Sequence, residues 1–78
     1  MLIEIRMPRL RPEMTSGMLA SWLKQEGERF EKGEALFEVE TDKVVNQVEA
    51  ERGGVVRQLI AEEGDEVAPG DVIALIED

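Results

Sequence analysis

The chain has 78 residues with 18 acidic and 9 basic side chains, a formal net charge of −9, and neither cysteine nor histidine. That length allows one small domain with a thin core, so we treat residues 1–78 as a single domain. The missing side chains exclude a disulfide framework, the ordinary zinc, haem and iron–sulfur ligand sets, thiol nucleophiles and imidazole bases. We therefore expect no catalytic residues. A metal site built only from carboxylate oxygens stays conceivable, but no segment resembles a calcium loop with alternating acidic ligands and a central glycine, so we expect no metal site. The negative charge disfavours nucleic acid and anionic membranes as partners.

Short apolar runs separated by glycine-containing turns predict an all-β chain without helices. In chain order, we expect strands at about Leu2–Met7, Met18–Lys24, Ala35–Thr41, Val44–Ala50, Val55–Ala61 and Val72–Glu77, with short bridging strands near Phe30 and Val67. The first segment alternates like a strand and lacks the apolar stretch of a signal peptide, and no apolar run approaches the ~20 residues of a membrane span. Alternation does not decide which side chains of Met18–Leu23 face inward.

The chain also repeats itself, because residues 17–40 match residues 54–77 at a constant offset of 37 without a gap. The identical pairs are Gly17/Gly54, Glu26/Glu63, Gly27/Gly64, Gly33/Gly70 and Glu40/Glu77, with conservative apolar matches between them. Such a repeat predicts two similar antiparallel sheets related by a pseudo-twofold axis, which face each other as a flattened barrel or sandwich. Phe30 and Val67 lie midway between paired glycines, where each would fill a corner of the fold.

Between the two halves, the segment from Glu40 to Val44 reads Glu-Thr-Asp-Lys-Val and lies between two apolar–polar strands. This pattern predicts a hairpin turn at Thr41–Val44, and the absence of glycine favours a type I turn. The turn would lift Asp42 and Lys43 into solvent, and the repeat places both chain ends at the opposite end of the fold. A single lysine in a turn is usually only solvated, which is how we interpret Lys24 and Lys32.

Lys43 differs because its context resembles a known family. The run EGERFEKGEALFEVETDKV, followed by Glu49–Ala50 and Gly54, is similar to the lipoyl domain of the dihydrolipoyl acyltransferase component of 2-oxo acid dehydrogenase complexes, in the biotinyl/lipoyl attachment family. The match extends from Met7 to Ile76. It implies a barrel-sandwich hybrid of two four-stranded sheets, with lipoic acid in amide linkage to Lys43 on a protruding turn.

The resemblance further implies a covalent swinging-arm carrier that is not an enzyme by itself. Its lipoyl group would accept an acyl group from a thiamine-dependent decarboxylase, deliver it to coenzyme A at an acyltransferase catalytic domain, and be reoxidised by a flavin-dependent dihydrolipoamide dehydrogenase. A lipoate ligase or lipoyltransferase would attach the group, and Glu40, Asp42 and Val44 are the residues that we expect it to read. Asp42 equally well caps the turn. The expected location is the cytoplasm of a bacterium or the mitochondrial matrix of a eukaryote.

The loop MPRLRPEMTSG departs from the pyruvate-type pattern Met-Pro-x-Leu-Ser-Pro-Thr-Met-x-Glu-Gly, because Arg11, Glu13 and Ser16 replace Ser, Thr and Glu. In the family this loop lies near the lipoyl-lysine and helps the decarboxylase to recognise its carrier. The resemblance therefore makes Arg9, Leu10, Arg11 and Glu13 candidates for partner recognition, and it leaves the 2-oxo acid open. The alternative is that both arginines are only solvated.

Three other functions compete with this hypothesis. A biotin carrier shares the fold but typically reads Ala-Met-Lys-Met, whereas Asp42 and Val44 flank the lysine here. A glycine-cleavage carrier would be lipoylated too, but those chains are longer. An unmodified barrel of the kind found in membrane-fusion adaptors needs no hairpin lysine. Whether the chain is an excised domain or a free-standing carrier stays open.

Overall fold

Eight β-strands make up the regular structure of the chain, and the computed structural model describes all residues, 1–78. The strands are β1 (Leu2–Arg6), β2 (Gly17–Trp22), β3 (Arg29–Phe30), β4 (Ala35–Thr41), β5 (Val44–Glu49), β6 (Gly54–Leu59), β7 (Glu66–Val67) and β8 (Val72–Glu77). The prediction of an all-β chain is confirmed, and the bounds of β4 and β8 agree with those expected from the sequence. No helix that could cross a membrane is present.

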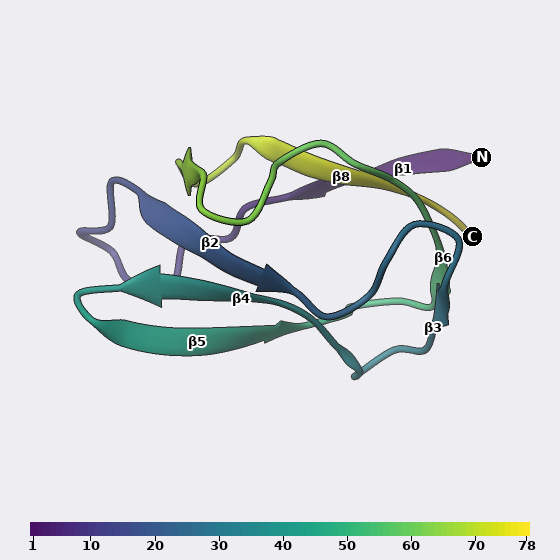
Figure 1. Cartoon of the computed structure of the whole chain (residues 1–78), viewed down its shortest axis with the longest axis horizontal. Coiled ribbons are helices and arrows are strands. Elements are labelled where there is room, and N and C mark those ends of the chain that lie inside the picture. Colours follow the sequence, from purple (N-terminus) through teal and green to yellow (C-terminus); the bar gives the residue numbers. More distant parts are fainter.

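The strands form two four-stranded antiparallel sheets, in the orders β1-β8-β6-β3 and β5-β4-β2-β7. The sheets face each other as a sandwich that does not close into a barrel, which decides between the two architectures that the repeat allowed. Figure 1 shows the β4–β5 turn at one end of the long axis and both chain termini at the other. A group attached to the turn is therefore held at the end of the molecule opposite the N- and C-termini.

Backbone hydrogen bonds between the halves of the sequence follow the pseudo-twofold symmetry. The Gly27 amide donates to the Val56 carbonyl at 2.8 Å, and 37 residues on, the Gly64 amide donates to the Leu19 carbonyl at 2.7 Å. Both glycines have a positive φ, 91° and 96°, which explains the glycine at each corner because larger residues rarely adopt it. Each half thus supplies a corner that holds a strand of the other half, so the halves stabilise each other.

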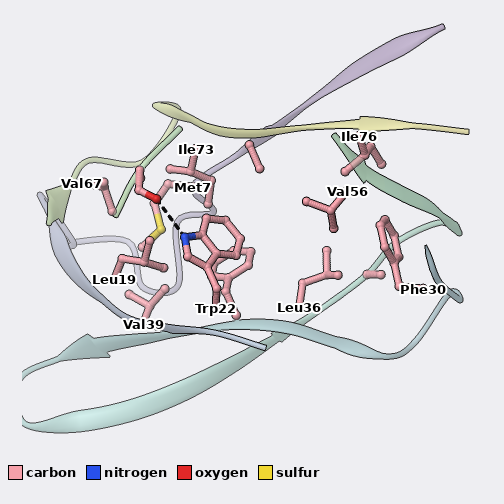
Figure 2. Close-up of a cluster of buried hydrophobic side chains, with 14 of the residues drawn as sticks. Met7, Leu19, Trp22, Phe30, Leu36, Val39, Val56, Val67, Ile73 and Ile76 are labelled. Carbon is pink, nitrogen blue, oxygen red and sulfur yellow. Dashed lines mark hydrogen bonds between the residues drawn. The ribbon is translucent and has the colours of Figure 1, made fainter. Parts of the chain in front are cut away.

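The core between the sheets consists of aliphatic and aromatic side chains. Its buried members are Met7, Met14, Leu19, Trp22, Phe30, Leu36, Phe37, Val39, Ala50, Val56, Ala61, Val67, Ile73, Ala74 and Ile76. As expected from their positions between paired glycines, Phe30 and Val67 are both buried, and Figure 2 shows them at opposite ends of the core. Near the middle, the rings of Trp22 and Phe37 lie 5.3 Å apart in a tilted arrangement.

A β-bulge explains why the inward side chains of Met18–Leu23 could not be assigned from alternation. The pairing of β2 with β4 shifts register between Leu19 and Ser21, so that Leu19 and Trp22 are both buried although they are three residues apart. The equivalent pairing of β6 with β8 shifts between Val56 and Gln58. An extra residue in a strand reverses the faces that follow it, and this change depends on the partner strand.

Four strands end earlier than predicted, β1 and β5 by one residue and β2 and β6 by two. β2 ends at Trp22 and β6 at Leu59, each two residues before the expected end, because the chain turns there into the glycine corners. Lys24, beyond the end of β2, forms an ion pair with Glu34 at 3.2 Å, with 22% of its side chain exposed. Lys24 is therefore part of a surface contact, which corrects the expectation that it is only solvated.

Loss of the indole N–H of Trp22 should destabilise the fold. The Trp22 Nε1 donates to the buried carbonyl of Ala61 at 2.8 Å, drawn as the dashed line in Figure 2. Trp22→Phe keeps an aromatic ring but leaves this carbonyl unpaired, so the free energy of unfolding should fall by about 1–3 kcal/mol. Urea denaturation followed by far-UV circular dichroism measures the change. Ile60→Ala, at a half-exposed position, is the control, and it should lose less free energy of unfolding. Equal stability of Trp22→Phe and wild type would contradict the role of this hydrogen bond.

The carboxylates of Glu34 and Glu77 have a lowered pKa, which makes the free energy of unfolding depend on pH in the acidic range. The backbone amide of Glu31, which donates to Glu34 at 2.6 Å, lowers the pKa of Glu34 below its usual 4.5, and Lys24 lowers it further. The Arg57 guanidinium, which donates a hydrogen bond to the Glu77 carboxylate, lowers the pKa of Glu77. Because the folded-state pKa is depressed, each contribution to stability is present above the usual pKa and is lost as pH falls through the folded value.

We therefore expect the free energy of unfolding of wild type to fall more steeply below a pH of about 4.5 than that of the variant Glu34→Gln/Glu77→Gln. The measurement is urea denaturation at a series of pH values between neutrality and pH 3. Glu51→Gln, which changes an exposed carboxylate outside any hydrogen bond or ion pair, should keep the wild-type slope. If the free energies of unfolding of wild type and of the double variant fell in parallel with decreasing pH, the contribution of Glu34 and Glu77 to the acid dependence would be refuted.

Candidate functional site

The β4–β5 turn consists of only two residues, Asp42 and Lys43, because Thr41 and Val44 already pair across the hairpin. Both turn residues have a positive φ, 49° for Asp42 and 64° for Lys43. Positive φ at both central positions is the signature of a type I′ turn, so the expectation of a type I turn is wrong. The reason is the right-handed twist of the flanking strands, which a two-residue type I′ turn matches and a type I turn does not.

Lys43 occupies the position at which such turns normally carry glycine. Type I′ turns favour Asn-Gly or Asp-Gly, because glycine adopts positive φ without steric cost and Asp tolerates it better than most residues. Here the pair is Asp-Lys, and a side chain with a Cβ in this conformation costs roughly 1–2 kcal/mol. The Lys43 side chain is exposed, and no hydrogen bond or ion pair involves its ammonium group. A strained position thus presents an exposed amine that makes no hydrogen bond or ion pair within the protein.

The base of the turn is held firmly by buried contacts. Thr41 is 8% exposed, and its hydroxyl accepts a hydrogen bond from Asn46 Nδ2 at 3.3 Å, across the hairpin. Gly17 of β2 lies against the same place, since a Cβ there would come within 2.8 Å of Val39 Cγ1 and 3.1 Å of Thr41 Cγ2. Beyond this anchored base, Val44 and Val45 are more than half exposed. The turn is therefore a small projection on a rigid sheet.

Thr41, Asn46 and Gly17 were not identified as site residues from the sequence. The signal that could have indicated Asn46 is its presence in a predicted strand, where asparagine is depleted. Gly17 was noted as part of the repeat, but its close approach to β4 depends on the packing of β2. Thr41 was placed in the turn without a contact of its own.

The loop between β1 and β2 is held from within by Arg9. Its Nη1 donates to the carbonyl of Pro12 at 3.2 Å and to that of Met14 at 2.5 Å. Met14 is buried, and its sulfur accepts a hydrogen bond from the Leu10 amide at 3.4 Å. Leu10 packs against the core. The loop is therefore a defined structure, and Arg9 is engaged with its own backbone instead of being only solvated.

Arg11 connects this loop to the turn. Its Nη2 lies 2.5 Å from Asp42 Oδ2, and its Nε lies 3.9 Å from Glu13 Oε1. The Arg11 Nε is buried and makes no hydrogen bond, so the guanidinium is pressed against the protein surface. The structure thus brings Arg11, Glu13 and Asp42 together beside Lys43. Arg11, like Arg9, is not merely solvated.

Glu40 lies apart from this cluster. It pairs with Met18 of β2 and Val45 of β5 inside the sheet and is half-buried, and its side chain makes no hydrogen bond or ion pair. A groove of about 430 Å³ between the edges of β1 and β5 includes no residue of the turn. Lys43 consequently stands in the open, and no group of three or more acidic side chains is placed to hold a metal ion.

Comparison with known proteins places the chain in a family. The family model described as biotin-requiring enzyme, the biotin/lipoyl family, matches residues 3–76. The chain is 47% identical over 73 residues to the dihydrolipoyllysine-residue succinyltransferase component of the 2-oxoglutarate dehydrogenase complex of Staphylococcus saprophyticus, covering 94% of this chain and 17% of that protein. It is 43% identical over 77 residues to the acetyltransferase component of the pyruvate dehydrogenase complex of Zymomonas mobilis, covering 97% and 18%. The chain therefore spans less than a fifth of the length of these curated relatives.

Among solved structures, the chain is similar to the lipoyl domain of the 2-oxoglutarate dehydrogenase complex from Azotobacter vinelandii, with a TM-score of 0.78 and 34% identity. The alignment covers 97% of this chain and 96% of that domain. A multi-domain long-chain acyl-CoA carboxylase has the same fold at 17% identity, with a TM-score of 0.81. From the family model and the match to a lipoyl domain over nearly the full length of both chains, we conclude that this chain belongs to the biotin/lipoyl family and is a lipoyl domain.

Proposed function

We propose that the domain carries lipoic acid on Lys43 and acts as the swinging arm of a 2-oxo acid dehydrogenase complex. The observation that carries this proposal is the exposed amine of Lys43, which has no ion pair and sits at a strained turn position where glycine would be more stable. A residue kept there against its conformational preference points to a chemical role. The amine fits the proposed group, because an amide bond needs one accessible nitrogen and no enclosing pocket.

The amide bond joins the Lys43 Nζ to the carboxyl carbon of lipoate, which a lipoate ligase or lipoyltransferase must first activate. Asp42 and Val44 flank the amine and are exposed, so a modifying enzyme can contact both. Glu40 lies within the sheet on the same hairpin and would be read from its outer face. We propose that these three residues identify the turn to the modifying enzyme.

When attached, the lipoyl group supplies a disulfide that takes up an acyl group and gives it up to coenzyme A. What the protein contributes is the placement of Lys43. The anchored hairpin holds the root of the arm at one end of the long axis, and the chain termini leave from the other (Figure 1). A tether at the termini therefore leaves the arm unobstructed, and it raises the effective concentration of the group at each active site.

The partners follow from the relatives, which are acyltransferase components of pyruvate and 2-oxoglutarate dehydrogenase complexes. We propose a thiamine-dependent decarboxylase, an acyltransferase catalytic domain and a flavin-dependent dihydrolipoamide dehydrogenase. The β1–β2 loop, with Leu10 and Glu13 beside the arginines, would help the decarboxylase to recognise the domain. The bacterial and mitochondrial relatives favour the cytoplasm or the mitochondrial matrix as the location.

Modification in vitro tests the attachment site. Incubation with lipoate, ATP and a lipoate ligase should add one lipoyl group, and peptide mapping should place it on Lys43. A parallel sample with biotin and a biotin ligase should stay unmodified. Lys43→Arg should abolish the mass increase, whereas Lys32→Arg, at an exposed lysine in a corner turn, should leave it unchanged. Biotin as the only attached group would assign the domain to a carboxylase, and no gain from either ligase would favour an unmodified interaction module.

Substitution of Lys43 by glycine should stabilise the fold while removing the attachment site. Glycine relieves the positive φ of 64°, and the gain should exceed the entropy that glycine adds to the unfolded chain. We expect the free energy of unfolding to rise by about 0.5–1 kcal/mol and the melting temperature by a few degrees. Thermal unfolding followed by circular dichroism measures this.

Lys32→Gly is the matched control. Lys32 is another exposed lysine in a turn, but it is not among the residues with positive φ. Glycine there brings only the entropic cost, so this variant should lose about 0.5–1 kcal/mol. A loss of stability in Lys43→Gly similar to that in Lys32→Gly would mean that the turn stores no strain.

A further inference from the structure

One ion pair joins two segments that are far apart in the sequence, the β1–β2 loop and the lysine turn. Arg11 and Asp42 are 31 positions apart, yet Arg11 Nη2 lies 2.5 Å from Asp42 Oδ2. Asp42 is the residue immediately before Lys43. No other hydrogen bond or ion pair in the structure joins a side chain of the loop to Asp42 or Lys43.

While Arg11 makes this contact through Nη2, its Nε–H group is left without a hydrogen bond. This Nε is buried, and Glu13 Oε1 lies 3.9 Å from it. An arginine that was only solvated would keep this N–H in water. The guanidinium is thus committed to Asp42, although 40% of the side chain remains exposed.

The two segments that the pair connects are rigid for different reasons. The loop is held by the bonds from Arg9 to Pro12 and Met14, and by burial of the Met14 side chain. The turn is anchored at Thr41 but strained at its tip, where both residues have positive φ. The ion pair is therefore a clamp between a fixed loop and the least favourable part of the hairpin.

We propose that Arg11 is a positioning residue, which acts through Asp42 to fix the root of the swinging arm against the β1–β2 loop. A decarboxylase then meets the loop and the attachment lysine as one surface with a fixed relative placement. This inference rests on the proposed lipoyl-carrier function. Exposed ion pairs contribute little to global stability, so the pair should matter more for recognition than for folding.

The test is a double-mutant cycle with Arg11→Gln and Asp42→Asn on the lipoylated domain. Both changes remove a charge. Gln is shorter than Arg but keeps a polar amide, whereas Asn has the size of Asp and tolerates positive φ as well as Asp does. The measured quantity is the rate of reductive acylation by the decarboxylases of the pyruvate and 2-oxoglutarate complexes from the organism that makes the chain. Each single variant should raise the KM for the domain roughly fivefold, as loss of about 1 kcal/mol of coupling implies. The kcat should change little, and the double variant should be no worse than either single one.

Arg52→Gln and Asp78→Asn form the matched control cycle, because this exposed ion pair, at 3.1 Å, involves the last residue of the chain instead of the turn. Neither variant should change the KM. Effects of Arg11→Gln and Asp42→Asn that multiply in the double variant would show that the two residues act independently and would overturn the proposal. The same conclusion would follow if both single variants were acylated like wild type.

A measurement without the partner gives a second test. Nitrogen-15 relaxation should show lower order parameters for the amides of Asp42 and Lys43 in Arg11→Gln than in wild type, and unchanged values would contradict the clamp. Failure of the proposed function is distinguishable. In that case mass spectrometry would find no lipoyl group on Lys43 of the wild-type domain, or neither decarboxylase would acylate the lipoylated domain, although the relaxation result would still report on the clamp.

Discussion

The two-residue β4–β5 turn is the constraint on which the site depends. The twist of its strands requires positive φ at both positions, and this conformation turns the side chains of Asp42 and Lys43 outward from the end of the sheet. Glycine would satisfy the backbone at lower cost, but the proposed amide linkage to lipoate needs a side-chain amine. The domain accepts the strain of a lysine at this position, and the buried contacts of Thr41 at the base of the hairpin help to offset it.

The rest of the fold makes this compensation possible in a chain that has no disulfide. Each half of the repeat supplies a glycine corner that bonds to a strand of the other half, so a thin core is supported at both ends. The same symmetry separates the lysine turn from the chain termini (Figure 1). A carrier needs both properties, because its arm must move between active sites while the domain that bears it stays folded and tethered.

The sequence predicted the strands and the sandwich well, because apolar runs, glycine turns and the repeat are local or regularly spaced signals. Among the features that were missed, three show the physical reasons most clearly. The bulge between Leu19 and Ser21 depends on the partner strand β4. The turn type was inferred from the absence of glycine, whereas strand twist decided it. The contact between Arg11 and Asp42 joins distant segments, and neither residue alone indicates the other.

The most direct test of the central claim is the modification state of the protein in cells that make lipoate. The domain would be isolated from such cells and analysed by tandem mass spectrometry of the peptides that contain Lys24, Lys32 and Lys43, the three lysines of the chain. The account predicts a lipoyl group on Lys43 and unmodified side chains at the other two. An unmodified Lys43, or a lipoyl group on Lys24 or Lys32, would contradict it.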